Sequence, residues 1–91
     1  MKSILVVTDE RHIARLVQVN LERQGYEVAV ACDLREARRK IDARRPDALI
    51  VDYLSYENLT EFLASLHRDP KSPLIRVLDM RRPNSWRQPW A

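Results

Sequence analysis

Glycine and cysteine are almost missing from this chain of 91 residues, which contains one of each. A lone Cys32 excludes an internal disulfide and a cysteine-based zinc site, and we interpret it as a small apolar residue at a strand end. A single glycine excludes a glycine-rich phosphate loop, which argues against nucleotide hydrolysis. No apolar run reaches the roughly 18 residues that span a bilayer, and the apolar start is too short for a signal peptide. We therefore expect a cytoplasmic protein with no membrane contact.

The composition supports one packed domain with a mild excess of positive charge. Apolar residues make up 45% of the chain, which is enough for a core and argues against disorder. Sixteen Lys and Arg stand against thirteen Asp and Glu, which gives a net charge of +3. This balance permits nucleic-acid or acidic protein partners and requires neither.

Short apolar runs alternate with segments of helical period along the chain. We expect strands at Ser3–Thr8, Tyr26–Ala31, Ala48–Asp52 and Pro73–Leu78, and helices at Arg11–Gln24, from Asp33 to Arg44, and from Asn58 to the residue before Pro70. Continuous apolar runs are typical of strands that are covered on both faces. The alternation predicts an α/β fold in which a doubly wound parallel sheet carries helices on both faces.

Local signals support two of these helix ends. Gly25 follows the first helix at the point where a left-handed residue stops a helix. Asp33 and Glu36 have the spacing of a capping box at the start of the second helix. Apolar residues recur at helical spacing along the first helix, and we expect them to face the core: Ile13, Leu16, Val17 and Leu21.

Acidic residues end the first and third predicted strands. Asp9 and Asp52 therefore fall on the carboxyl edge of the sheet, where function collects in folds of this kind. Two carboxylates at one edge of the sheet can bind a hard divalent cation. Asp9 taken alone would more simply cap the following helix, and Glu10 is either an auxiliary metal ligand or an acid favoured by the helix dipole.

Three motifs in order resemble the response-regulator receiver family of two-component signalling. They are ILVVTDE at 4–10, QGYEV at 24–28 and PDALIVD at 46–52. The resemblance runs from Lys2 to about Met80. It implies a flavodoxin-like fold with four strands in the order 2-1-3-4 and about three helices, lacking the last part of the receiver fold. The domain would then be 1–80, followed by a Pro/Arg/Trp tail at 81–91.

The resemblance also implies a chemistry. Asp52 would accept a phosphoryl group from a histidine kinase. Mg²⁺ would be held by Asp9, Asp52 and the backbone carbonyl of Leu54, with Glu10 as a further candidate ligand. The ion would neutralise the charge that otherwise keeps a carboxylate from attacking phosphorus.

The sequence departs from the family pattern around this site. Thr8 stands where the family has the first of two acids, and Leu78 aligns with the Ser or Thr that ends the fourth strand. The lysine that follows the fifth strand is absent. Because charge stabilisation dominates phosphoryl transfer, we expect phosphorylation of Asp52 to be slow or absent. We expect a degenerate, C-terminally truncated receiver that is not an enzyme and acts through protein–protein contacts.

Two alternatives stay open. The first is a functional, Mg²⁺-dependent phosphoacceptor at Asp52. The second is a basic adaptor that binds nucleic acid through a cluster on and after the second helix, made of Arg35, Arg38, Arg39, Lys40, Arg44 and Arg45. No base-reading motif accompanies this cluster, so a solvated helix face, or an acidic protein partner, explains it better.

The part of the family fold that this sequence lacks predicts an interface. Its absence would leave the strands beside Ile13, Leu16 and Val17 partly bare and would make strand four an open edge. Arg76, expected in the middle of that strand, would limit uncontrolled pairing. We expect a homodimer through strand four or the tail, with Trp86 and Trp90 as aromatic anchors. The alternative is a frayed tail whose tryptophans matter little.

Overall fold

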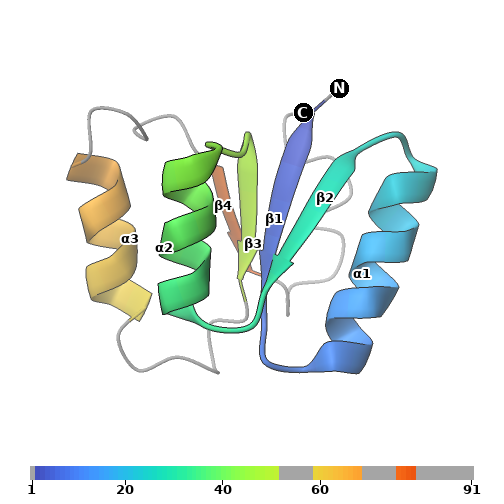
Figure 1. Ribbon diagram of the computed structural model, residues 1–91, viewed down its shortest axis with the longest axis horizontal. Coiled ribbons are helices and arrows are strands. Elements are labelled where there is room, and N and C mark those ends of the chain that lie inside the picture. The colour runs from blue at the N-terminus through green and yellow to red at the C-terminus, as the bar shows by residue number, and fades with distance from the viewer. Residues whose placement is uncertain (1, 52–58, 69–75, 80–91) are drawn as a thin grey trace.

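The structure is a computed structural model that describes residues 2–51, 59–68 and 76–79. Strands and helices alternate along the described residues (Figure 1). The strands are β1 (Ser3–Val7), β2 (Glu27–Ala31), β3 (Ala48–Val51) and β4 (Arg76–Asp79), and the helices are α1 (Arg11–Arg23), α2 (Leu34–Ala43) and α3 (Leu59–Arg68). The predicted alternation is confirmed.

The four described strands form one parallel sheet in the order β2-β1-β3-β4, as predicted. Consecutive parallel strands need a crossover, and each of the three helices supplies one. The fourth strand ends one residue later than predicted, at Asp79, and its predicted start at 73–75 lies outside the described residues. Arg76 is the first described residue of β4 and pairs with Ala48. Its predicted place in the middle of the strand depends on residues 73–75 and stays a prediction.

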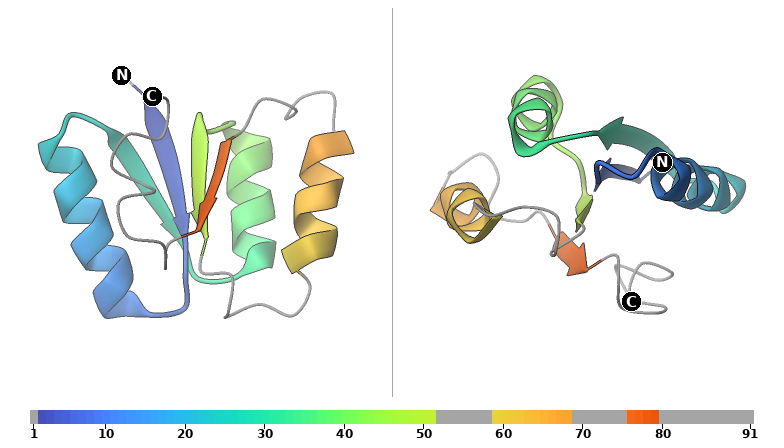
Figure 2. Two further views of the ribbon diagram at one scale, coloured as in Figure 1. Left: turned by 180° about the vertical axis from the view of Figure 1, so that it is seen from behind. Right: turned by 90° about the horizontal axis from the view of Figure 1, so that it is seen from below.

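The helices divide between the two faces of the sheet. Figure 2 shows α1 on one face and α2 with α3 on the other. Alternate residues of β1 point to opposite faces of the sheet. Leu5 and Val7 pack toward α2 and α3, whereas Ile4 and Val6 pack toward α1. β3 divides in the same way, so both central strands are apolar on both faces, apart from Ser3 at the start of β1. This is the reason that their sequences are continuous apolar runs.

The face of α1 that packs on the core differs from the one that the spacing of its apolar residues predicts. Val17 and Leu21 are buried as expected, but Ile13 is 38% exposed and Leu16 is 63% exposed, and Ala14 takes a core position instead. The set Ala14, Val17 and Leu21 follows the i, i+3, i+7 spacing of one narrow stripe. A small residue at the first of these positions lets the start of the helix approach the sheet.

The strands beneath α1 are not bare, and that prediction is wrong. Ile4, Ala48 and Ile50 face the α1 side of the sheet and are at most 1% exposed. They form one cluster with Val17 and Leu21 of α1, which packs on this face of the sheet. The exposed apolar surface therefore lies on the outside of the helix.

Two hydrogen bonds begin α2 as the capping-box spacing predicts. The Asp33 carboxylate accepts the N–H of Glu36 at 2.7 Å, and the Glu36 carboxylate accepts the N–H of Cys32 at 2.8 Å. The first bond satisfies an N–H of the first helical turn that has no intrahelical partner, and the second holds the residue before the cap. The turn from β2 into α2 is thereby fixed by two side chains.

The carboxylate of Asp47 ties the start of β3 to the start of β1. It accepts the N–H of Ser3 at 2.8 Å, and the Asp47 N–H donates to the Ser3 carbonyl at 2.9 Å. This pair sets which residues of the two strands lie side by side. The Pro46-Asp47 part of the third motif thus has a structural role at the edge opposite to the strand-end acids.

Gly25 ends α1 in a left-handed conformation, with φ +93°, as predicted. Its N–H donates to the carbonyl of Glu22 at 3.0 Å, and the N–H of Tyr26 donates to the carbonyl of Leu21 at 3.1 Å. These two bonds make a Schellman motif, and Tyr26 packs on the cluster that contains Leu21.

Replacing Gly25 with alanine is expected to destabilise the domain by about 1 kcal/mol, because only glycine adopts this conformation without strain. A Cβ at this position would meet no atom within 4 Å, so the effect isolates backbone conformation. Urea unfolding measures it, with Gln24→Ala as the control in the preceding residue, whose φ is −88°. Equal unfolding midpoints for the two variants would contradict the assignment.

None of the described helices combines the length and the apolar character that a bilayer crossing needs.

Candidate functional site

The four strands end level with one another at the carboxyl edge of the sheet. Val7 pairs with both Ala31 and Val51, and Val51 pairs with Asp79. The residues that follow the strands at this edge therefore begin at the same level of the sheet. This is the edge at which ligands bind in open parallel sheets.

Thr8 is the first residue beyond β1, and it is 2% exposed. Its N–H donates to the carbonyl of Ala31 at 3.0 Å, and its Oγ1 accepts the N–H of Glu10 at 3.1 Å. The side chain thus serves the turn that leads into α1. The family that the sequence resembles has an acid at this position, so a neutral, internally bonded hydroxyl stands where the resemblance predicts a charge.

Asp9 and Glu10 follow, and both are exposed. The residue that caps α1 is Glu10, and no side chain makes a cap hydrogen bond there. The simpler interpretation of Asp9 as a helix cap is therefore wrong, because the hydroxyl of Thr8 already accepts the first N–H of the turn. Asp9 stands at the site edge with its carboxylate facing solvent.

The remaining predicted site residues fall mostly beyond the described ranges. Asp52 and Leu54 follow β3 and lie outside the described residues, as do Trp86 and Trp90. Within 2–51, 59–68 and 76–79, no three His, Cys, Asp or Glu gather closely enough to hold a metal ion.

One carboxylate residue at this edge was missed. Asp79 ends β4 and pairs through its backbone with Val51, whereas Leu78, predicted as the last residue of the strand, pairs with Ile50. The rule that singled out Asp9 and Asp52, an acid at the end of an apolar run, applies equally to Asp79. Aligning the strand on Pro73 concealed it.

The basic cluster is largely engaged in contacts within the domain. Arg38 lies 3.4 Å from Asp42, and Arg39 lies 3.7 Å from Glu36. Arg44 forms an ion pair with Glu27, Lys40 donates a hydrogen bond to the Val30 carbonyl, and Arg45 also has a partner. Phosphate contact would have to compete with these partners. The first four of these contacts lie within α2 or join the end of α2 to β2.

Comparison with known proteins agrees with this geometry. A sequence model described as the response regulator receiver domain matches residues 4–84. The alkaline phosphatase synthesis transcriptional regulatory protein PhoP of Bacillus subtilis is 47% identical over 53 residues, which are 58% of this chain and 22% of that protein. The chain thus spans less than a quarter of that relative's length.

Two solved structures share the fold. The chemotaxis response regulator CheY4 of Vibrio cholerae superposes with a TM-score of 0.80 at 30% identity, over 87% of this chain and 67% of that one. The response regulator TrrA of Thermotoga maritima, solved in complex with Mg²⁺ and BeF, gives a TM-score of 0.73 at 23% identity, over 98% and 94% of the two chains. The latter likeness concerns the fold alone.

Proposed function

The chain belongs to the response regulator receiver family of two-component signalling, and from that membership we propose that it is a degenerate receiver, working through protein–protein contacts. It would take part in signalling beside a histidine kinase or another signalling protein, without turning over a substrate. The proposal concerns this domain, since the relatives with known roles are several times longer.

The observation that carries the proposal is the state of Thr8. Its hydroxyl is buried and accepts the N–H of Glu10, so it adds no charge to the edge. Receiver domains typically bind Mg²⁺ at the phosphorylation site, and affinity for such an ion rises with the number of charged oxygen ligands. With a threonine at this position, Asp9 and Glu10 are the carboxylates that β1 brings to the edge.

The described residues supply part of a site for Mg²⁺. A hard cation prefers several oxygen ligands, and β1 brings the exposed carboxylates of Asp9 and Glu10 to this edge. Among the described residues, no three His, Cys, Asp or Glu lie close enough together to hold the ion. Asp52 and the Leu54 carbonyl would have to supply the rest. We derive no chemical step through the ion.

Incubation with acetyl phosphate and Mg²⁺ tests the proposal directly. We expect intact mass spectrometry to show little or no added phosphoryl group after times that fully modify a conventional receiver. The reason is that an attacking carboxylate needs its neighbouring charges neutralised by a well-held cation. CheY4 of Vibrio cholerae, which shares the fold, serves as the reference protein.

The variant Asp52→Asn is the control for this experiment. A rapid adduct in the unmodified chain that disappears in Asp52→Asn would reject the degenerate assignment. It would instead support the alternative of a functional phosphoacceptor, which the exposed carboxylate of Asp9 at the level strand edge favours. An adduct that persists in the variant lies on another residue and supports neither.

The nucleic-acid alternative has weaker support. Binding of basic side chains to a phosphate backbone is driven by counterion release, but Arg38 and Arg39 already face carboxylates of their own helix. A salt-dependent shift of duplex DNA in a gel would revive it.

The contact surface we propose is the outer side of α1. Ile13 and Leu16 are large apolar side chains that stay exposed, one helical turn apart. They adjoin the edge that carries Asp9, so a protein bound there would also reach the site. In a homodimer, β4 or the tail of a second copy would cover them, with Trp86 and Trp90 as anchors and Arg76 limiting further pairing along β4.

Substituting glutamate for Leu16 is expected to abolish such association while changing the free energy of unfolding by less than about 0.5 kcal/mol, because the residue is 63% exposed. Light scattering at tens of micromolar would give a dimer for the parent chain and a monomer for Leu16→Glu. Arg15→Gln, which lowers the net charge by the same one unit at a neighbouring exposed position, is the charge-matched control. A parent chain that is monomeric at these concentrations would contradict the homodimer.

A further inference from the structure

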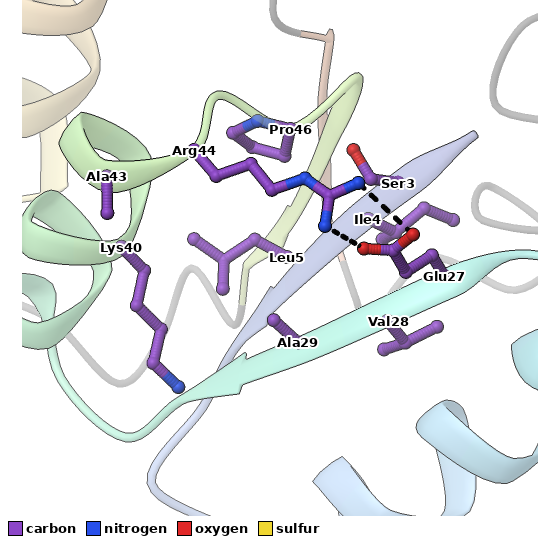
Figure 3. A pocket seen from close by; sticks show the side chains of 10 residues that line it. All are labelled: Ser3, Ile4, Leu5, Glu27, Val28, Ala29, Lys40, Ala43, Arg44 and Pro46. Atoms are coloured by element: carbon purple, nitrogen blue, oxygen red, sulfur yellow. Dashed lines mark hydrogen bonds and ion pairs between the residues drawn. The ribbon is translucent and has the colours of Figure 1, made fainter. Parts of the chain in front are cut away.

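A pocket of about 240 Å³ lies between α2 and β2, far from the carboxyl edge (Figure 3). Leu5, Ala29 and Ala43 form apolar walls, and Glu27, Lys40 and Arg44 supply charged groups. Ser3 and Glu27, which begin β1 and β2, are among its lining residues. Neither the phosphoacceptor edge nor the outer side of α1 shares these residues, so the pocket is separate from the proposed function.

The hollow exists because small side chains face each other across it. Ala29 on β2 and Ala43 near the end of α2 contribute single methyl groups where longer side chains would fill the space (Figure 3). Ala29 pairs with Leu5 in the sheet, and the exposed side chain of Ala29 leaves that part of the wall open to solvent. At about 30 Å³ per water molecule, the volume corresponds to about eight waters. This is smaller than a typical drug-sized site, so it suits a small molecule.

The charged groups of the pocket are unequal in number. Two cations, Lys40 and Arg44, face one anion, Glu27. The terminal nitrogens of Arg44 contact both carboxylate oxygens of Glu27, with Nη2 to Oε2 at 3.2 Å, and the pair spans one end of the pocket (Figure 3). The Lys40 ammonium donates to the Val30 carbonyl, so its aliphatic stem runs along the pocket.

The ion pair at the mouth is open to exchange. The side chain of Arg44 is 70% exposed and that of Glu27 is 43% exposed, and pairs as exposed as this contribute little to stability. A guanidinium has N–H donors beyond the two that a bidentate contact uses. A second carboxylate can therefore bind Arg44 beside Glu27 or in its place at small cost, and it would balance the excess positive charge.

We propose that this pocket binds a small amphipathic carboxylate, with its apolar body against Ala29, Ala43 and Leu5 and its carboxylate on Arg44. The apolar body gains by leaving water, and the charge-assisted hydrogen bonds to Arg44 fix the orientation. A ligand of this size binds weakly, with a dissociation constant in the millimolar range.

Sodium octanoate, kept below its micelle concentration, is the probe, and backbone amide chemical shifts are the measurement. We expect saturable shifts at Ser3, Ala29 and Ala43, with no comparable change at Leu16 on α1. Octanol, which has the same chain without the charge, is expected to bind more weakly. Shifts that are unsaturable, or that centre on Ile13 and Leu16, would overturn the proposal.

Two variants with matched controls separate the parts of the pocket. Arg44→Gln is expected to weaken octanoate binding by roughly tenfold, whereas Arg45→Gln, which does not line the pocket, leaves it unchanged. Ala29→Leu fills the hollow and is expected to abolish binding, whereas Ala64→Leu on the exposed side of α3 does not. Full binding by Ala29→Leu would place the ligand elsewhere and reject the assignment.

Discussion

Substituting aspartate for Thr8 is expected to raise the affinity of the domain for Mg²⁺ by roughly ten- to a hundredfold, since each added charged ligand strengthens a hard-cation site. The new carboxylate would leave β1 at the level edge, directly before Asp9. Without the ion the variant is expected to be less stable than the parent by about 1–3 kcal/mol, because a buried charge replaces a hydroxyl that is bonded to the Glu10 N–H. Thermal unfolding over a Mg²⁺ titration measures both effects, because an ion that binds the native state raises Tm.

The neutral variant Thr8→Asn separates charge from shape at this position. Its amide has nearly the size of the carboxylate and loses the same hydroxyl, but it is expected to gain little Mg²⁺ affinity. If Thr8→Asp and Thr8→Asn respond to Mg²⁺ equally, position 8 has no part in an ion site. The proposal of a degenerate receiver would then lose its main support.

Replacing Leu49 with alanine is expected to lower the free energy of unfolding by about 3–5 kcal/mol, the upper range for a buried leucine. Leu49 is 0% exposed and lies in the central strand β3, between β1 and β4, in the core that α2 and α3 cover. Neighbours on all sides limit collapse into the space that the lost side chain leaves. The total free energy of unfolding of a small domain is only about 5–15 kcal/mol, so this loss is a large part of it. The melting temperature Tm is expected to fall by more than about 12 °C.

Leu16→Ala is the matched control for that substitution. It removes the same atoms from a side chain that is 63% exposed, and alanine favours helix, so a change below about 0.5 kcal/mol is expected. Comparable losses in the two variants would mean that β3 is not the packed centre of the domain.

Much of the fold could be predicted from the sequence because its signals are local or strongly periodic. The apolar runs at β1 and β3, the capping box of Asp33 and Glu36, and the position of Gly25 each follow from one segment of chain. The strand order came from the resemblance, and residue patterns alone would not have supplied it. These elements agree with one another, which is typical of natural sequences.

Features that depend on two segments could not be predicted in the same way. Glu27 and Arg44, which are 17 residues apart in the sequence, form an ion pair that no short-range pattern indicates. The inward face of α1 was misjudged because Ala14, which takes the core position, carries a weaker hydrophobic signal than Ile13 and Leu16. Residue volume at the contact with the sheet decides that rotation, and periodicity does not measure volume.

At the candidate site, the residue types were predictable and their partners were not. The sequence indicates that Thr8 breaks the family's acidic pair, but not that its hydroxyl accepts the Glu10 N–H. Asp79 was missed because the end of β4 was set one residue early, and strand boundaries are the least certain part of such predictions.

The all-parallel arrangement of the sheet also has a consequence for how the chain reaches its folded state. Among the described strands no two neighbours are joined by a tight hairpin, because a helix lies in every connection between them. The segments α1, β2 and α2 separate β1 from β3 in the sequence. Contacts so distant in sequence give the domain a high contact order, which slows folding because loop entropy is lost before the contacts form. The β1–α1–β2 unit closes the shorter of the two loops from β1, so it is the natural nucleus. Until β3 pairs with β1, that unit exposes an apolar strand edge, and dilute refolding conditions should therefore favour recovery of the native fold over aggregation.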